Sequence, residues 1–249
     1  MKQLSIVLVG IFLLIMNNCG GDKSSEETSS SSSSSTQNSE TLTHNGTNYG
    51  TVVSPYTGKV WLDRNLGAAR VCTSFNDTAC YGDYYQWGRN FDGHQESTSS
   101  TTTQQVADIN SAGNEFVLDS GQHRGDWAND SDRSGDKRMA LISSSDGSFV
   151  CPKDFRVPSV GEFLAETAQA SAQVKNNMDA YNNFLKLPSS GSRMGSTGNM
   201  RIDDTSAFYM VRGGNYDRST DYFYYSSDDI GKGGLSARVN GQTIRCIKK

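Results

Sequence analysis

Residues 57–95 read TGKVWLDRNLGAARVCTSFNDTACYGDYYQWGRNFDGHQ, and this stretch decides the fold. It contains two of the three Trp and two of the five Cys residues of the chain. Its apolar positions Val60, Leu62 and Leu66 alternate with polar residues over a short distance between two glycines. This pattern predicts a half-buried strand that runs into a turn. Two Tyr and one Trp then follow within residues 84–87 and form an aromatic cluster in the sequence.

Parts of this stretch resemble a known domain signature. The segments WLDRNLGA (61–68) and YGDYYQWGR followed by DGHQ (81–95) are similar to the signature of the Fibrobacter succinogenes major paralogous domain family. Further matches lie at CPKDFRVPSVGEF (151–163), ARVNGQTIRCI (237–247) and VRGGNYD (211–217). The last of these resembles the formylglycine-generating enzyme fold, a relative of C-type lectin domains. The resemblance covers residues 50–249 and implies one loop-rich, C-type-lectin-like α+β domain with short antiparallel strands and about two helices.

The start of the chain predicts export and a membrane anchor. Lys2 precedes a short apolar run, residues 4–16, which is too short to span a bilayer as a stable helix. Residues 1–18 and the following Cys19 resemble a bacterial lipoprotein signal peptide. The resemblance implies that Cys19 is the first mature residue and carries lipid, such as palmitate, on the outer membrane or cell surface. The alternative is an ordinary secretory signal with an incidental Cys.

Residues 19–40 predict a flexible tether. The segment is rich in Ser and lacks the apolar side chains that would offset the entropy lost on ordering, so we expect it to be disordered. Its acidic residues Asp22, Glu26 and Glu27 are similar to surface-export signals of some Gram-negative lipoproteins. A solvated linker with incidental charge is the alternative. The globular domain is therefore expected over residues 41–249.

Local patterns predict several elements inside this domain. Gly46–Val53 and Lys59–Asp63 read as a strand pair that is turned by residues 55–58. Ser159 followed by Glu162 fits a capping box, in which the hydroxyl and the carboxylate each accept a backbone N–H. A helix of about three turns is expected to follow this box.

A second helix is predicted from an apolar stripe, with core packing as the role of its members. The stripe consists of Val174, Met178, Tyr181 and Leu185. Residues 106–150 show no sustained periodicity and predict a long irregular excursion, which in compact domains is typical of functional or disordered segments. The Gly-rich and aromatic last third predicts a loop-rich antiparallel sheet.

The cysteines predict disulfide bonds. Four remain after Cys19, namely Cys72, Cys80, Cys151 and Cys246, and an even number in an exported chain favours bridges over free thiols. Three connectivities are possible. Cys72 and Cys80 flank a short polar loop and pair most economically with each other, which leaves Cys151 for Cys246. A zinc site is the rival interpretation, but no CxxC spacing occurs.

Two ligand sites are predicted inside the excursion. Asp130, Asp132, Ser134 and Asp136 stand around a glycine in the order of an EF-hand-like calcium loop, although position 12 of that loop is occupied by Leu141. A solvated turn is the alternative to calcium.

The second site combines an aromatic ring with polar neighbours. Trp127 beside Asp126 and Asn129 suits a sugar, because the indole face can stack on the ring while the acceptors bind its hydroxyls. A buried anchoring role for Trp127 is the alternative interpretation.

The composition argues against two classes of function. A net charge of −4 leaves no basic stripe for phosphates, which excludes nucleic acid as a partner. His44, His94 and His123 lie in different segments without a nucleophile motif, so no enzyme activity is expected. The expected function is a surface-exposed, lipid-anchored binding module that engages glycan or protein through long loops. A structural cell-envelope component without a specific ligand is the alternative.

Overall fold

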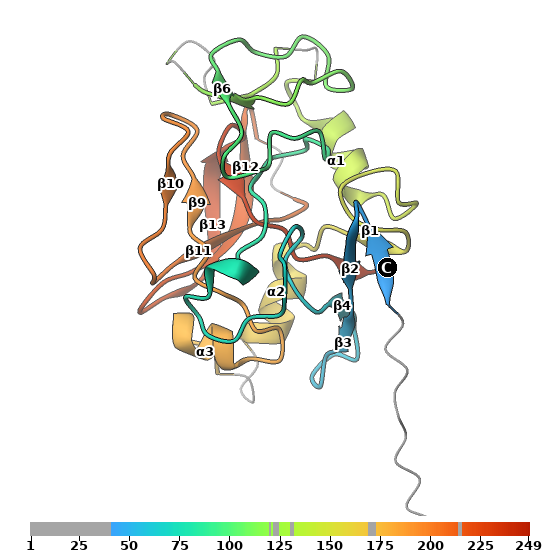
Figure 1. Ribbon diagram of the computed structural model, residues 1–249, viewed down its shortest axis with the longest axis vertical. Coiled ribbons are helices and arrows are strands. Elements are labelled where there is room, and N and C mark those ends of the chain that lie inside the picture. The colour runs from blue at the N-terminus through green and yellow to red at the C-terminus, as the bar shows by residue number, and fades with distance from the viewer. Residues whose placement is uncertain (1–40, 120, 122–124, 130–131, 169–172, 214–215) are drawn as a thin grey trace, which may run out of the picture. The chain divides into compact units, whose positions relative to one another are not determined.

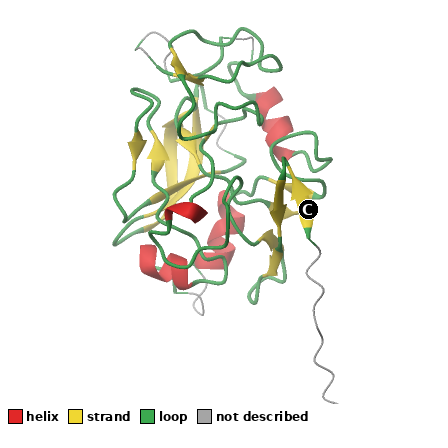
Figure 2. Ribbon diagram, viewed as in Figure 1, coloured by secondary structure: helices red, strands yellow, loops and turns green. Residues whose placement is uncertain are grey.

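Figure 1 shows the computed structural model, which describes residues 41–119, 121, 125–129, 132–168, 173–213 and 216–249. The described residues belong to one compact unit, a loop-rich α+β arrangement of short strands and three α-helices (Figure 2). The helices are α1 (Asp136–Ser143), α2 (Val160–Thr167) and α3 (Asn177–Asn182), with a 3-10 turn at Thr78–Cys80. Within these ranges no helix is long and apolar enough to cross a membrane.

The strands of the described residues form five small sheets, and only β6 with β7 is a parallel pair within them. Two sheets have two strands each, β1 (Leu42–His44) with β2 (Thr47–Tyr49) and β6 (Thr101–Thr102) with β7 (Phe116–Val117). One sheet has three strands in the order β11 (Ala207–Met210), β12 (Ser219–Tyr225) and β13 (Ile230–Ala237). Two sheets have four strands, in the orders β3 (Thr51–Val53), β4 (Val60–Leu62), β15 (Ile247–Lys248), β8 (Phe155–Arg156) and β10 (Met200–Arg201), β9 (Ser192–Arg193), β14 (Gly241–Gln242), β5 (Tyr85–Gln86).

The predicted strand pair is confirmed in part, since β3 and β4 run antiparallel. The first half of the predicted strand 46–53 is a separate strand, β2, which pairs with β1. Ser54 closes the turn between β3 and β4, because its N–H donates to Lys59 O while its Oγ accepts the N–H groups of Tyr56 and Thr57. β4 also pairs with β15, and β15 pairs with β8. One sheet therefore holds together strands from the beginning, the middle and the end of the described chain.

One hydrophobic cluster lies on the inner face of the β11–β12–β13 sheet. Along β12, Phe223 and Tyr225 are buried while Tyr222 and Tyr224 are only partly buried, because successive strand residues point to opposite faces. Phe163 of α2 stacks on Phe223 with ring centroids 4.4 Å apart. Burying a Phe side chain contributes about 1.5–3 kcal/mol, so α2 is well held on this face. The opposite face of the sheet keeps its aromatic residues half-exposed.

The capping box of α2 is confirmed. Glu162 N–H donates to Ser159 Oγ at 3.2 Å, and Ser159 N–H donates to the Glu162 carboxylate at 2.8 Å. These two reciprocal bonds satisfy donors that a helix N-terminus otherwise leaves without a partner. The sequence pattern therefore located the start of α2 correctly.

The predicted second helix is shorter than its apolar stripe implied. Asn176 caps α3, and its side chain accepts the Asp179 N–H at 2.9 Å. Val174 and Leu185 consequently lie outside the helix, although both are buried. Met178, which lies inside it, is 44% exposed. The core contacts come largely from the segments that flank α3, so the interpretation of one continuous helical face was wrong.

Residues 106–150 were expected to be irregular, and this prediction was wrong for residues 136–143, which form α1. The helix begins at Asp136, and the carboxylate of Asp132 accepts the N–H groups of Lys137 and Arg138 in its first turn at 2.9 and 3.1 Å. The buried positions of α1 are Arg138 and Ile142, and only one of these is apolar. A search for an apolar stripe therefore cannot detect the helix.

Both predicted disulfides are present. Cys72 is bonded to Cys80 with a Cα–Cα distance of 5.1 Å, and Cys151 is bonded to Cys246 with a Cα–Cα distance of 6.0 Å. The second bond lies in a cluster of buried apolar residues that includes Leu62. It ties the segment before β8 to the segment before β15.

Candidate binding site

Trp127 lies in the core and not on a binding surface. Its side chain is 0% exposed, and its Nε1–H donates to Trp87 O at 2.8 Å. The guanidinium groups of Arg138 and Arg89 lie 5.3 and 5.4 Å from the indole ring, which places cation–π contacts on it. The predicted sugar-stacking role of Trp127 is corrected to that of a buried anchor, because the ring is inaccessible to a ligand.

Asp126 and Asn129, the partners predicted for Trp127, line one cavity of about 220 Å³ but make different contacts. The Asp126 carboxylate is buried and accepts from Arg138 Nη1 at 2.7 Å, Arg138 Nη2 at 3.0 Å and Arg238 Nη1 at 3.0 Å. Buried ion pairs of this kind are costly to break, so this carboxylate serves the fold. Asn129 is exposed, and its N–H donates to Val106 O at 2.8 Å. The structure therefore brings Asp126 and Asn129 to one cavity, and Trp127 is not part of its lining.

The segment predicted to bind calcium, residues 130–136, contacts the guanidinium group of Arg138. Asp130 lies outside the described residues. Asp132 pairs with Arg138 Nε at 3.2 Å, and Ser134 Oγ donates to Asp136 at 2.7 Å. Nowhere in the described ranges do three or more His, Cys, Asp or Glu side chains form a group that could hold a metal ion. Asp132 therefore pairs with an arginine and accepts N–H groups of the first turn of α1. Calcium binding by Asp130, Asp132, Ser134 and Asp136 together stays a prediction.

His94 holds a loop in place. Its Nε2 accepts Gln86 N–H at 3.1 Å, so its Nδ1 carries the proton and donates to Asp92 at 2.5 Å. Burial lowers the pKa of His94 to about 4 even though Asp92 opposes this shift, and the ring is neutral at pH 7. Arg89 also pairs with Asp92 at 2.8 Å. These bonds position Gln95, the next residue along the chain.

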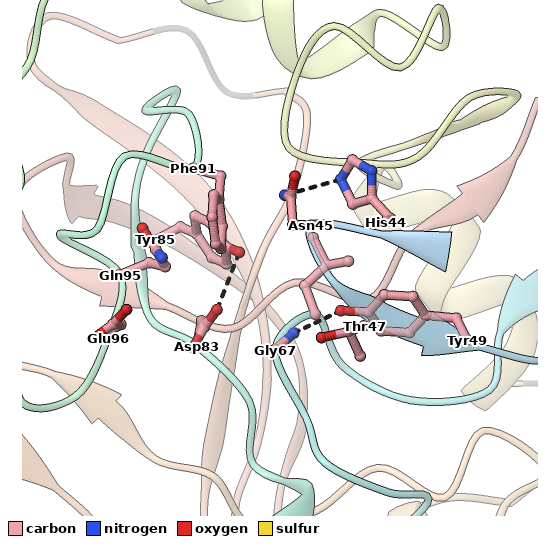
Figure 3. A pocket seen from close by; sticks show the side chains of 11 residues that line it. His44, Asn45, Thr47, Tyr49, Gly67, Asp83, Tyr85, Phe91, Gln95 and Glu96 are labelled. Atoms are coloured by element: carbon pink, nitrogen blue, oxygen red, sulfur yellow. Dashed lines mark hydrogen bonds between the residues drawn. The ribbon is translucent and has the colours of Figure 1, made fainter. Parts of the chain in front are cut away.

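A cavity of about 160 Å³ lies between the β1–β2 hairpin and residues 83–96 (Figure 3). We call it the hairpin pocket. The hairpin contributes His44, Asn45, Thr47 and Tyr49 to its lining. The opposite side contributes Asp83, Tyr85, Phe91, Gln95 and Glu96, and Leu66 and Gly67 complete the lining. Two of these residues are carboxylates and none is Lys or Arg, so the pocket has an acidic character.

An Asn-Gly turn shapes one side of the hairpin pocket. Asn45 and Gly46 have φ angles of 47° and 76°, and two left-handed residues in succession are the signature of a type I′ hairpin turn. His44 Nε2 lies 2.8 Å from Val150 O, which is consistent with a hydrogen bond that holds the hairpin against the segment before β8. Gly46 therefore belongs to the turn, and the strand predicted over residues 46–53 is divided into β2 and β3, which lie in different sheets.

Two glycines of the 57–95 stretch bring Asp83 into the pocket. Gly67 has a φ of 76°, and a Cβ atom at this position would lie 2.3 Å from the Asp83 carboxylate. Gly82 is also left-handed, and the next N–H, that of Asp83, donates to Leu66 O at 2.9 Å. Only glycine adopts this backbone region without strain and leaves such room. The carboxylate therefore sits directly against the backbone.

Asp83 is a carboxylate without a cationic partner in the pocket. Burial raises its pKa to about 7, and the nearby Glu96 acts in the same direction. The hydroxyl of Tyr85 donates to Asp83 at 3.3 Å and partly offsets the effect of burial (Figure 3). A ligand that donates hydrogen bonds to Asp83 would stabilise its charged form.

Gln95 supplies a hydrogen-bond donor that the described residues leave without a partner. Its Oε1 accepts the N–H groups of Asp92 and Gly93, at 3.3 and 2.9 Å, which fixes the orientation of the amide. The side chain is 0% exposed, and its Nε2 is buried without a hydrogen bond to any described residue. Such a group costs about 1–3 kcal/mol when it stays unsatisfied. Phe91 at the same pocket is 43% exposed and presents an aromatic face.

The predicted ligand site lay in the excursion, and the hairpin pocket was not predicted. Its lining comes from the hairpin and from residues 66–67, 83, 85, 91 and 95–96. An Asn-Gly pair between short alternating segments was the available signal for the hairpin. No local pattern shows that this hairpin faces residues 83–96.

Comparison with known proteins adds no relative to these observations. No family model, curated protein or solved structure matches the chain.

Proposed function

We propose that this protein is a lipid-anchored binding module of the cell surface that engages a glycan through the hairpin pocket. The observation that carries the proposal is the buried side-chain N–H of Gln95, which makes no hydrogen bond to any described residue, beside the carboxylate of Asp83, which meets no cation among those residues. A sugar hydroxyl suits both groups, because it accepts from the amide and donates to the carboxylate.

The other lining residues support the same ligand class. Glu96 provides a second acceptor for hydroxyl groups, and the exposed ring of Phe91 provides a surface for the C–H face of a sugar. A phosphate or another anion is disfavoured, because two carboxylates line the pocket without a Lys or Arg. The proposal assigns a binding function and no catalytic step.

The proposed location rests on the sequence alone. Cys19 with the preceding apolar run supports a lipid anchor, and residues 19–40 support a tether between that anchor and the domain. These residues lie outside the described part of the chain. The resemblance to the Fibrobacter succinogenes major paralogous domain family likewise stays a prediction.

A glycan array probed with the purified full chain tests the function. Phe91→Ala should weaken retention of the bound glycans about tenfold, since one aromatic contact is worth about 0.5–1.5 kcal/mol. Glu96→Gln should also weaken binding, and both variants should unfold within about 0.5 kcal/mol of wild type because both side chains lie at the pocket opening. Tyr56→Ala removes a partly exposed ring outside the pocket and is the matched control.

The outcomes separate the two function classes. Retention of specific glycans that depends on Phe91 and Glu96 supports the binding module. If no glycan is retained, or if retention survives both substitutions, the hairpin pocket is not a glycan site. The structural cell-envelope role would then be the better explanation.

A further inference from the structure

The outer face of the β11–β12–β13 sheet carries a row of aromatic rings. Phe208 of β11 and Tyr222 and Tyr224 of β12 are half-buried and point away from the core. The ring centroid of Tyr222 lies 5.7 Å from that of Phe208 and 5.8 Å from that of Tyr224. The three rings therefore form a continuous aromatic surface and not isolated exposed side chains.

Glycines in the neighbouring strand allow these rings to lie across the sheet. Gly233 and Gly231 of β13 stand opposite Tyr222 and Tyr224 in the register. A Cβ atom at Gly233 would lie 1.9 Å from Tyr222 Cζ, so any other residue would displace the ring. Glycine in general weakens a strand. In β13 the glycines leave the room that the aromatic rings of β12 occupy.

A groove of about 410 Å³ runs beside this surface, and we call it the aromatic groove. Its apolar lining includes Phe208, Tyr222 and Leu235, of which Leu235 is 69% exposed. Asn240 and Gln242 provide amide groups on its polar side. The groove is therefore larger than the hairpin pocket and combines stacking surfaces with hydrogen-bonding groups.

Gln242 indicates what a ligand must supply. Its side chain is 2% exposed, and its Nε2 donates to Ser236 Oγ at 3.3 Å. Its Oε1 is buried and has no hydrogen-bond partner among the described residues. A ligand in the groove that donates a hydrogen bond would satisfy this acceptor, as a hydroxyl group does.

The charges of the aromatic groove favour a neutral ligand. Its lining, as far as the chain is described, contains no carboxylate and one charged side chain, Arg201, which lies 5.6 Å from the Phe208 ring and 4.0 Å from Asp203. The hairpin pocket differs, because Asp83 and Glu96 make it acidic. The two cavities are thus suited to different parts of a ligand or to different ligands.

We propose that the aromatic groove is a second site, which binds successive units of a neutral polysaccharide chain. The inference rests on the proposed glycan-binding function and adds the ligand class. Adjacent rings can each stack on the C–H face of one sugar unit, and a hydroxyl of the chain donates to Gln242 Oε1. Two of the rings, Phe208 and Tyr222, line the groove, and Tyr224 continues the aromatic row beyond it. A chain of sugar units fits this extended surface better than a single terminal sugar does.

Affinity electrophoresis of the full chain through gels that contain soluble glucans, mannans, galactans or xylans tests the inference. Acidic polysaccharides such as pectate and alginate form the counter-panel. Tyr222→Ala and Gln242→Met should each weaken retention by the neutral polymers about tenfold. Gln242→Met should keep or raise the melting temperature, since it replaces an unsatisfied buried acceptor with an apolar chain of similar size. Tyr216→Ala removes an exposed ring outside the groove and should retain wild-type binding.

The outcomes distinguish the two sites. Retention that grows with oligosaccharide length, is lost in Gln242→Met and persists in Phe91→Ala supports the aromatic groove. Wild-type retention in Gln242→Met, retention by acidic polymers alone, or no retention by any neutral polymer overturns the inference. If Tyr222→Ala fails to fold, Gln242→Met decides. The hairpin pocket is judged separately, by Phe91→Ala and Glu96→Gln on the array.

Discussion

Asp83 couples the hairpin pocket to pH through a single proton. Its pKa in the folded protein is about 7, whereas the ordinary value for this side chain is 3.8. The folded protein therefore binds this proton more tightly than the unfolded chain does. As pH rises from about 4 to about 7, the contribution of Asp83 to the free energy of unfolding decreases, and it stays low above that range.

Asp83→Asn should raise the melting temperature at about pH 8 and leave it nearly unchanged at about pH 4, because the amide carries no charge to bury. The shift in pKa corresponds to at most about 4 kcal/mol of unfolding free energy. Calorimetry of wild type and variant at both pH values measures the effect, with the exposed Asp228→Asn as control. An equal difference at the two pH values would contradict the role assigned to burial.

The same proton should control ligand binding. Above pH 7 the ionised Asp83 accepts hydrogen bonds from two hydroxyl groups at once, whereas its protonated form donates one bond and accepts fewer. We expect glycan affinity at the hairpin pocket to rise as pH increases through 7, and we expect Asp83→Asn to abolish this dependence. Titration calorimetry across that range decides the point, and an affinity that falls with increasing pH would exclude Asp83 as the acceptor.

At the scale of elements, the start of α2 rests on a local capping box. Ser159→Ala removes the hydroxyl that accepts Glu162 N–H and should lower the free energy of unfolding by about 1 kcal/mol. Urea denaturation measures this loss, with the exposed Ser227→Ala as the control. An unchanged transition midpoint in Ser159→Ala would mean that the packing of Phe163 alone determines where α2 begins.

Elements with local signals could be predicted from the sequence, and elements that depend on distant partners could not. The capping box and the strand pair β3–β4 rest on neighbouring residues, and both predictions are confirmed. α1 instead depends on Arg138, which is buried because Asp126 and Asp132 pair with it. A buried arginine removes the apolar stripe by which an amphipathic helix is recognised.

The candidate site shows the same division. The 57–95 stretch supplies six of the eleven residues that line the hairpin pocket. The position of this pocket could not be predicted, because Asp83 meets Gly67 through left-handed turns and the hairpin approaches from another sheet. For Trp127 the alternative interpretation, a buried anchor, is the one found, because the ring is buried and its neighbour Asp126 binds arginines in the core.

At the scale of the whole molecule, distant parts of the described chain meet in one sheet. β4 pairs with β15, and β15 pairs with β8, while Leu62 N–H donates to Cys246 O at 3.0 Å. The bond between Cys151 and Cys246 crosses the same region. The β-sheet contacts and the covalent bond therefore constrain the same long loop, whose closure is entropically costly in the unfolded chain.

The two disulfides should differ in their contribution to stability. Cys151–Cys246 spans a sequence separation of 95 residues and Cys72–Cys80 a separation of 8. In the chain-entropy model, disulfides that close loops of these lengths raise the free energy of unfolding by about 4.7 and about 2.5 kcal/mol. Replacing Cys151 and Cys246 by Ala together should therefore lower the free energy of unfolding by about 2 kcal/mol more than replacing Cys72 and Cys80, and paired substitutions leave no free thiol to form wrong bonds. Urea denaturation of the two double variants makes the comparison, because it reports on the whole unit. A larger loss for the short loop would show that native packing around Cys72 and Cys80, and not restraint of the unfolded chain, determines what a disulfide contributes here.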